Sequence, residues 1–177
     1  MNKVPQLHKH MSPKSVGICI VTCSTSKFAQ TKAGEKADDK SGNIIERLTR
    51  EGGHEVKGRY LISDSKTMIQ RHVRNVLSSP EIDALIITGG TGLSPRDLTV
   101  ESVSPFLQKS IPGFGELFRK ISFDKIGSAA ILSRAVAGSS HGKLIFCLPG
   151  SPDAVRTAMT KLILPEIGHM LKVTREH

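Results

Sequence analysis

The chain has 177 residues, which is enough for one domain with a sizeable hydrophobic core. Its 25 Lys and Arg against 16 Asp and Glu give a formal net charge of +9, which indicates an anionic ligand or a thermally adapted charged surface. No segment approaches the roughly 18 consecutive apolar residues of a membrane span, and residues 1–14 lack the apolar centre of a signal peptide, so we expect a cytoplasmic protein without membrane contact.

Nucleic-acid binding is the function class that the charge alone would favour. The aromatic content is low, with one Tyr, six Phe and no Trp, and the basic residues are dispersed along the chain. Because single-stranded nucleic acid is usually held on aromatic platforms, we expect no nucleic-acid partner. The odd set of three cysteines lies in or at the end of apolar runs, so we expect neither a disulfide nor a zinc site.

The first half of the chain alternates continuous apolar runs, typical of strands buried on both faces, with apolar residues at helical spacing. This order predicts a parallel sheet with right-handed crossovers. After a mobile arm at 1–14, we expect a strand at 15–23, a loop or pocket lining at 24–27 and a mobile segment up to 39. A helix capped by Asp39 or Ser41 then ends before Gly52, and a strand at 54–63 lies near the sheet edge. The next elements are a strand at 83–88 and, before it, a helix that carries Ile69, Val73, Val76 and Leu77.

A proline interrupts the next predicted helix. Val103, Phe106 and Leu107 indicate a helix, and Pro105 either kinks one begun at Thr99 or begins a fresh one capped by Ser104. A helix start at residues 94–97, with a capping box and proline in the first helical position, supports the alternative of an ordinary turn. The remaining expected elements are a helix at 111–127, the two strands of a hairpin at 128–137 and 143–148, a closing helix that Pro165 bends or ends, and a frayed charged tail at 172–177.

These elements predict one α/β domain at residues 15–171. Its fold class is a Rossmann-like, three-layer α/β/α arrangement with a mostly parallel central sheet and a small hairpin at the sheet end. In such a sheet, ligands bind outside the carboxyl ends of the strands. The loops that follow the strands are therefore where we expect a site.

The loop after the third strand, Thr88-Gly89-Gly90-Thr91-Gly92, has the composition of an anion site. Its glycines permit conformations in which successive N–H groups face one concavity, and its threonines add hydroxyl donors. Arg96 supplies a cationic fork suited to phosphate, and Asp97 supplies a carboxylate that can hold a divalent cation against that phosphate. The alternative is an ordinary strand, glycine-rich turn and helix start. The combination of residue types favours a phosphate site.

Four of the predicted parallel strands end in small or polar residues. Their loops hold Ser24, Asp64, the glycine-rich stretch and the segment 149–153, and we expect them to share one sheet edge. Asp64 and Asp97 would then face one cavity, which suits metal-assisted phosphoryl or nucleotidyl transfer. Either carboxylate alone would be interpreted as an ordinary loop or capping residue. The chain has no Gly-x-x-x-x-Gly-Lys-Ser/Thr motif, so a P-loop NTPase is not expected.

Four motifs occur together and in this order: Thr88-Gly89-Gly90-Thr91-Gly92, Pro95-Arg96-Asp97-Leu98-Thr99, Leu132-Ser133-Arg134 and Pro149-Gly150-Ser151. With this combination the chain resembles the MoaB/MogA family of molybdenum-cofactor biosynthesis proteins, which includes the G domain of gephyrin. The stretches 113–119, 122–123 and 133–138 look closer to the MoaB branch of that family. The resemblance covers residues 15–171. It implies molybdopterin adenylylation, in which the terminal phosphate of the pterin attacks the α-phosphorus of ATP with magnesium and releases pyrophosphate.

The resemblance also implies roles for single residues. Asp64 and Asp97 would be the catalytic carboxylates and the Mg²⁺ ligands. The chain departs from many relatives at Ser24-Thr25, where they have Ser-Asp, and at Pro105. The implied nucleotide- and phosphate-binding residues are Thr88, Gly89, Gly90, Thr91, Gly92, Arg96, Pro149 and Gly150, and the implied pterin-binding residues are Ser24, Ser133 and Ser151.

A non-catalytic molybdopterin-binding protein of the MoaB type is the alternative, because some members of that branch have lost these carboxylates, although this chain keeps both. The residues do not distinguish a molybdenum from a tungsten pathway. The resemblance implies a homo-oligomer, with a hexamer favoured over a trimer, and a downstream metal-insertion protein as a further partner. Phe114, Phe118 and Phe123 are expected to supply the subunit interface unless the domain buries them internally.

Overall fold

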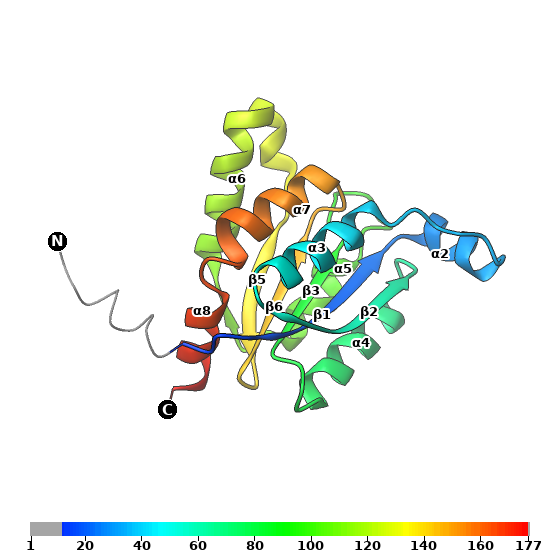
Figure 1. Ribbon diagram of the computed structural model, residues 1–177. Coiled ribbons are helices and arrows are strands. Elements are labelled where there is room, and N and C mark those ends of the chain that lie inside the picture. The colour runs from blue at the N-terminus through cyan, green and yellow to red at the C-terminus, as the bar shows by residue number, and fades with distance from the viewer. Residues whose placement is uncertain (1–11, 177) are drawn as a thin grey trace.

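Six strands form one sheet, in the order β2-β1-β3-β6-β5-β4, in the computed structural model, which describes residues 12–176 (Figure 1). Strands β1, β2, β3 and β6 run parallel, whereas β5 is antiparallel to β6 and β4 is antiparallel to β5. The mostly parallel α/β fold expected from the sequence is therefore confirmed. The strands are β1 (Gly17–Cys23), β2 (Glu55–Ile62), β3 (Ala84–Thr88), β4 (Lys109–Ser110), β5 (Val136–Ser140) and β6 (Lys143–Leu148).

Helices cover both faces of the sheet (Figure 1). Helices α3, α6, α7 and α8 pack on one face, and α4 and α5 pack on the other. Within residues 12–176, every helix is too short or too polar to cross a lipid bilayer. The helical elements are α2 (Thr25–Lys32), α3 (Lys40–Glu51), α4 (Lys66–Ser78), α5 (Thr99–Val103), the 3-10 helix η1 (Ser104–Phe106), α6 (Pro112–Ile126), the 3-10 helix η2 (Gly127–Leu132), α7 (Pro152–Ala158), the π-helical turn η3 (Met159–Ile163) and α8 (Ile167–Arg175).

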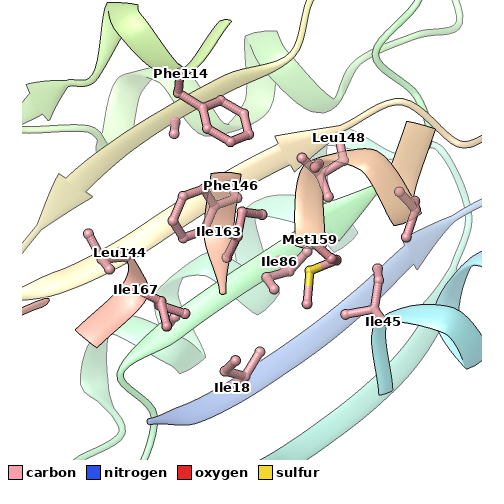
Figure 2. Close-up of a cluster of buried hydrophobic side chains, with 14 of the residues drawn as sticks. Ile18, Ile45, Ile86, Phe114, Leu144, Phe146, Leu148, Met159, Ile163 and Ile167 are labelled. Atoms are coloured by element: carbon pink, nitrogen blue, oxygen red, sulfur yellow. The ribbon is translucent and has the colours of Figure 1, made fainter. Parts of the chain in front are cut away.

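The central strands are continuous apolar runs because both of their faces are buried. In β1, Ile18 contacts the layer of α3, α6, α7 and α8, while its neighbour Cys19 contacts the opposite layer. In the larger layer, shown in Figure 2, the tilted rings of Phe114 and Phe146 lie 5.5 Å apart. Met159, Ile163 and Ile167, from the C-terminal part of the chain, pack into the same layer.

The segment after β1 is the first place where the structure differs from the prediction. Residues expected to form a loop and a mobile segment contain helix α2, and the hydroxyl of its N-cap Ser24 accepts a hydrogen bond from the Lys27 N–H. Helix α2 buries no residue. It therefore has no apolar periodicity by which a sequence pattern could reveal it.

The helix expected to begin at Thr99 does begin there, whereas the alternative helix start at residues 94–97 is wrong. Residues 94–97 instead form a turn in which the Asp97 N–H donates to the Ser94 carbonyl and the Ser94 N–H donates to Asp97 Oδ2, both at 2.9 Å. Helix α5 starts at Thr99, whose N–H and hydroxyl are held by the carbonyls of Gly90 and Gly89 at 2.9 and 2.8 Å. It passes into η1 with Pro105 in the first turn, so Pro105 begins a fresh helical turn.

The hairpin is shorter than predicted. The expected strand at 128–137 is helical in its first part, because Gly127 turns the chain at a φ of +62° and the alanines that follow have little strand preference. Strand β5 instead begins at Val136 and runs to Ser140, which leaves only His141 and Gly142 in the turn. The two-residue edge strand β4 was not predicted.

The two ends of the described chain meet at α8, which forms the C-terminal end and contacts the N-terminal end. Pro165 separates η3 from α8, as one of the two alternatives proposed, and α8 continues through Arg175, so the tail expected to fray is helical up to that residue. The Arg175 guanidinium donates to Asp83 Oδ1 at 2.6 Å. Most of the predicted N-terminal arm lies outside the described residues. At its end, the Pro13 carbonyl packs closely on Gly168 of α8.

Asp39 ties the start of α3 to the sheet. Its Oδ1 accepts the Gly42 N–H at 2.9 Å, and its Oδ2 accepts the Thr22 hydroxyl and the Arg59 guanidinium, each at 3.0 Å. Asp39 is 7% exposed. Because buried polar groups are costly when left without partners, removing this carboxylate would leave Thr22 and Arg59 without their acceptor.

We predict that Asp39→Ala lowers the free energy of unfolding by about 2–4 kcal/mol, since it removes a helix cap and a buried acceptor together. Urea denaturation followed by circular dichroism measures the change. The matched control is Asp38→Ala, because the Asp38 carboxylate is 67% exposed and lies 3.5 Å from Lys40 Nζ. Its change should stay below about 0.5 kcal/mol. Equal losses in the two variants would contradict the anchoring role of Asp39.

Candidate functional site

A cavity of about 480 Å³ opens at the carboxyl edge of the sheet. Three parts of the chain enclose it: the glycine-rich loop after β3, the end of α6 with η2, and the loop that leads from β6 into α7. Its size is within the range of small-molecule sites. The lining residues are Gly89, Gly90, Thr91, Gly92, Asp97, Phe118, Ser122, Lys125, Ile126, Ala129, Ala130, Leu132, Ser133, Arg134, Pro149, Gly150, Ser151, Asp153, Ala154 and Thr157.

The glycine-rich loop lies in close contact with the ends of the neighbouring strands. Gly89 and Gly90 have φ values of +94° and +62°, which a residue with a side chain adopts at a cost. A methyl group on Gly89 would lie 2.2 Å from the Cys23 carbonyl oxygen, and one on Gly150 would lie 3.3 Å from the Gly89 Cα. The loops after β1, β3 and β6 therefore meet backbone to backbone.

Hydroxyl groups brace this arrangement from below. Thr88 is fully buried and donates to the Pro149 carbonyl at 2.9 Å, and Ser41 at the start of α3 donates to the Gly150 carbonyl at 2.7 Å. Thr99 holds the carbonyls of Gly89 and Gly90. The carbonyls are thus turned inward, and within residues 12–176 the N–H groups of residues 90–92 donate to no protein acceptor. These amides are available to an anion.

Two carboxylates lie against different glycines of the loop. Asp64, after β2, accepts the N–H and the hydroxyl of Thr25 on Oδ2, each at 2.9 Å, and its Oδ1 would lie 2.7 Å from a methyl group on Gly90. Asp97 accepts the Ser94 N–H on Oδ2, and this oxygen would lie 2.8 Å from a methyl group on Gly92. Each carboxylate is therefore positioned by its own hydrogen bonds and set against a glycine whose missing side chain makes the close approach possible.

Arg134 fixes the wall opposite the sheet. Its Nε donates to the Thr91 carbonyl at 3.0 Å, and its two terminal nitrogens pair with the carboxylate of Glu101 on α5. The hydrogen bond from Arg134 lowers the pKa of the Glu101 carboxyl, so the pair stays charged at neutral pH. Arg134 belongs to the motif Leu132-Ser133-Arg134, but no role was predicted for it from the sequence. Its partner is 33 residues away, which no local pattern reveals.

Lys125 is a second cation in the cavity that sequence reasoning missed. Its Nζ donates to the Thr157 hydroxyl at 2.8 Å and lies 3.5 Å from Asp153 Oδ2. Lys125 belongs to α6 and the other two to α7. On the sequence, each is an unremarkable polar residue of a helix, and only the packing of α6 beside α7 brings them together (Figure 1).

The predicted site residues divide into two groups. Outside the cavity wall lie Ser24, which caps α2; Thr88, which is buried beneath the loop; Arg96, which is exposed; and Asp64, which borders Gly90 from the β2 side. Inside it the structure brings together Gly89, Gly90, Thr91, Gly92, Asp97, Ser133, Pro149, Gly150 and Ser151.

The cysteines near the site are poor nucleophiles. Burial raises the pKa of Cys23 to about 12 and that of Cys19 to about 11, and it also raises the pKa of Cys147. A thiol that stays protonated at neutral pH neither attacks phosphorus nor ligates a metal readily.

Known proteins are similar to this chain in both sequence and fold. The family described as a probable molybdopterin binding domain matches residues 19–169. Molybdenum cofactor biosynthesis protein B of Bacillus cereus is 45% identical over 92% of this chain and 93% of its own, and a probable molybdopterin adenylyltransferase of Methanocaldococcus jannaschii is 38% identical over 96% and 99%. A crystal structure of the tungsten cofactor synthesizing protein MoaB from Pyrococcus furiosus has a TM-score of 0.80 and 33% identity, covering 93% of this chain and all of that one. The chain therefore belongs to the family of probable molybdopterin binding domains.

Proposed function

We propose that this protein is a molybdopterin adenylyltransferase of molybdenum or tungsten cofactor biosynthesis. It transfers AMP from ATP to the terminal phosphate of molybdopterin and releases pyrophosphate. The observation that carries the proposal is the pair of carboxylates, Asp64 against Gly90 and Asp97 against Gly92, on a loop whose amides at 90–92 donate to no acceptor within residues 12–176. The relatives named molybdenum cofactor biosynthesis protein B and probable molybdopterin adenylyltransferase support the same pathway.

In this reaction a phosphate oxygen of molybdopterin attacks the α-phosphorus of ATP. The bond between that phosphorus and the oxygen bridging to the β-phosphorus breaks, and its electron pair leaves with pyrophosphate. The amides of residues 90–92 would hold non-bridging phosphate oxygens, whose charge grows as the bond breaks. The loop is braced before any ligand arrives, so its donors need little reorganisation.

The two carboxylates suit a magnesium ion that is carried by the substrate. Carboxylate oxygens are the ligands that Mg²⁺ prefers, and it commonly uses one or two of them together with phosphate oxygens and water. Within residues 12–176 no three His, Cys, Asp or Glu side chains form a group that could hold a metal by themselves. Asp64 and Asp97 would hold Mg²⁺, which when bound neutralises charge on the transferring phosphates.

We predict that Asp97→Asn lowers adenylylation by at least about a thousandfold, because it removes a charge needed only when phosphates and metal are in place. Release of pyrophosphate from ATP, magnesium and molybdopterin measures the rate. Asp124→Asn, an exposed change on α6 outside the cavity, is the matched control and should retain wild-type turnover. Urea denaturation of both variants checks that the fold persists.

The same assay separates this function from binding without catalysis. A wild-type chain that binds molybdopterin but never forms pyrophosphate would be a binding protein of the MoaB type. Near wild-type turnover by Asp97→Asn would contradict the assignment of Asp64 and Asp97 as catalytic carboxylates.

We also propose that the protein is a homo-oligomer, a hexamer in preference to a trimer. The core takes up Phe114 and Phe118, so two of the three phenylalanines predicted for the interface are buried within the subunit. The third, Phe123, is 59% exposed, and Ile131 on η2 is 79% exposed. With the exposed Leu117 they place large apolar groups on one stretch, α6 and η2, as a subunit interface would.

We predict that the wild-type chain is a hexamer or trimer in light scattering and that Ile131→Arg shifts it to smaller species, because a charge at an apolar interface is costly to bury. Val173→Arg is the control, since Val173 is also apolar and exposed but lies on α8. A monomeric wild-type chain would contradict the assembly. Dissociation by Val173→Arg alone would assign the interface to α8 instead.

A further inference from the structure

The cavity is lined by two chemically different sets of residues from different parts of the chain. One set is the glycine-rich loop and Asp97, with amide donors and a carboxylate suited to phosphate and metal. The other set, from α6, η2 and α7, combines apolar residues that include Phe118, Ile126 and Leu132 with the polar cluster of Lys125, Asp153 and Thr157. A ligand that carries both a phosphate and a polar-edged ring would match both sets.

The polar cluster presents a donor and an acceptor side by side. Lys125 Nζ is held by the Thr157 hydroxyl at 2.8 Å, while Asp153 Oδ2 lies 3.5 Å from the same nitrogen. The Lys125 and Asp153 side chains are 46% and 70% exposed. An exposed ion pair at this distance contributes little stability, so a ligand can take over both groups at small cost.

We propose that Asp153 and Lys125 recognise the 2-amino-4-oxopyrimidine edge of the pterin ring and so determine the specificity of the site. The carboxylate of Asp153 accepts the N3–H and one N–H of the 2-amino group, and the ammonium of Lys125 donates to the 4-oxo oxygen. The inference rests on the proposed function, because that function makes a pterin the substrate.

The hydrogen-bonding pattern favours a pterin over the adenine of ATP. A pterin edge offers two adjacent N–H donors to the two oxygens of one carboxylate, with an acceptor beside them for the cation. Adenine offers one amino donor and one ring acceptor along the corresponding edge, which leaves one oxygen of Asp153 without a partner. The apolar residues Phe118, Ile126 and Leu132 then pack on the flat faces of the ring, and the phosphate reaches toward the glycine-rich loop.

Binding of a fluorescent pterin, pterin-6-carboxylate, tests this recognition directly. Asp153→Asn replaces an acceptor oxygen by a donor and should weaken binding roughly ten- to a hundredfold, and Lys125→Gln should weaken it less. Asp124→Asn and Lys120→Gln, exposed changes on the same helix as Lys125, should leave binding unchanged. Lumazine-6-carboxylate, which has an oxo group in place of the 2-amino group, should bind the wild-type chain as weakly as pterin-6-carboxylate binds Asp153→Asn.

Steady-state kinetics separate this inference from the proposed function. Asp153→Asn should raise the KM for molybdopterin by a similar factor while leaving the KM for ATP near its wild-type value. A rise in the KM for ATP alone would make the cluster an adenine site and overturn the inference, as would absence of saturable pterin binding to the wild-type chain. If pterin binding is lost in Asp153→Asn but the wild-type chain forms no pyrophosphate, the recognition stands and the adenylyltransferase assignment fails.

Discussion

The site depends on one steric constraint, the close approach of three backbones at the carboxyl ends of β1, β3 and β6. Gly89 sits between Cys23 and Gly150, and there is no room on it for even a methyl group. The approach is possible only because β3 lies between β1 and β6 in the sheet, so that the loops after all three emerge at one edge. A side chain at Gly89 would push the three loops apart and displace the neighbouring amides of residues 90–92.

Burial and charge are divided between the two halves of the cavity. The strand half is braced by buried hydroxyls, Thr88, Thr99 and Ser41, whose partners are main-chain carbonyls. The helix half is made by α6, η2 and α7, where Lys125 and Asp153 are exposed and loosely paired. Rigid donors suit the phosphates, where geometry decides the rate, while adaptable side chains suit a ring that must enter and leave.

The parallel strands and the glycine-rich loop could be predicted from the sequence because their causes are local. Continuous apolar runs mark strands buried on both faces, and residues such as Gly89 and Gly90 mark conformations that other residues avoid. What escaped prediction has causes elsewhere in the fold. Helix α2 buries no side chain, and the two-residue strand β4 is defined by its pairing with β5. Lys125 and Arg134 line the cavity because of tertiary contacts, which produce no periodic pattern in the sequence.

The net charge of +9 is not what holds an anion in this cavity. Among the lining side chains, the cations Lys125 and Arg134 are matched by the carboxylates Asp97 and Asp153, and Arg134 is further neutralised by Glu101. The positive charge of the whole chain can steer an anionic substrate toward the protein over a distance set by the ionic strength. In the proposed reaction, the amides of residues 90–92, which donate to no acceptor within residues 12–176, hold the phosphate at close range. Arg134 is close enough to Asp97 for their charges to interact, but its terminal nitrogens pair with Glu101 and not with Asp97. A carboxylate paired directly with a guanidinium would compete poorly for magnesium. For the proposed metal-assisted transfer, a cavity lining without excess charge would leave Asp97 available to the metal, and the surplus of lysine and arginine elsewhere would serve encounter with the substrate.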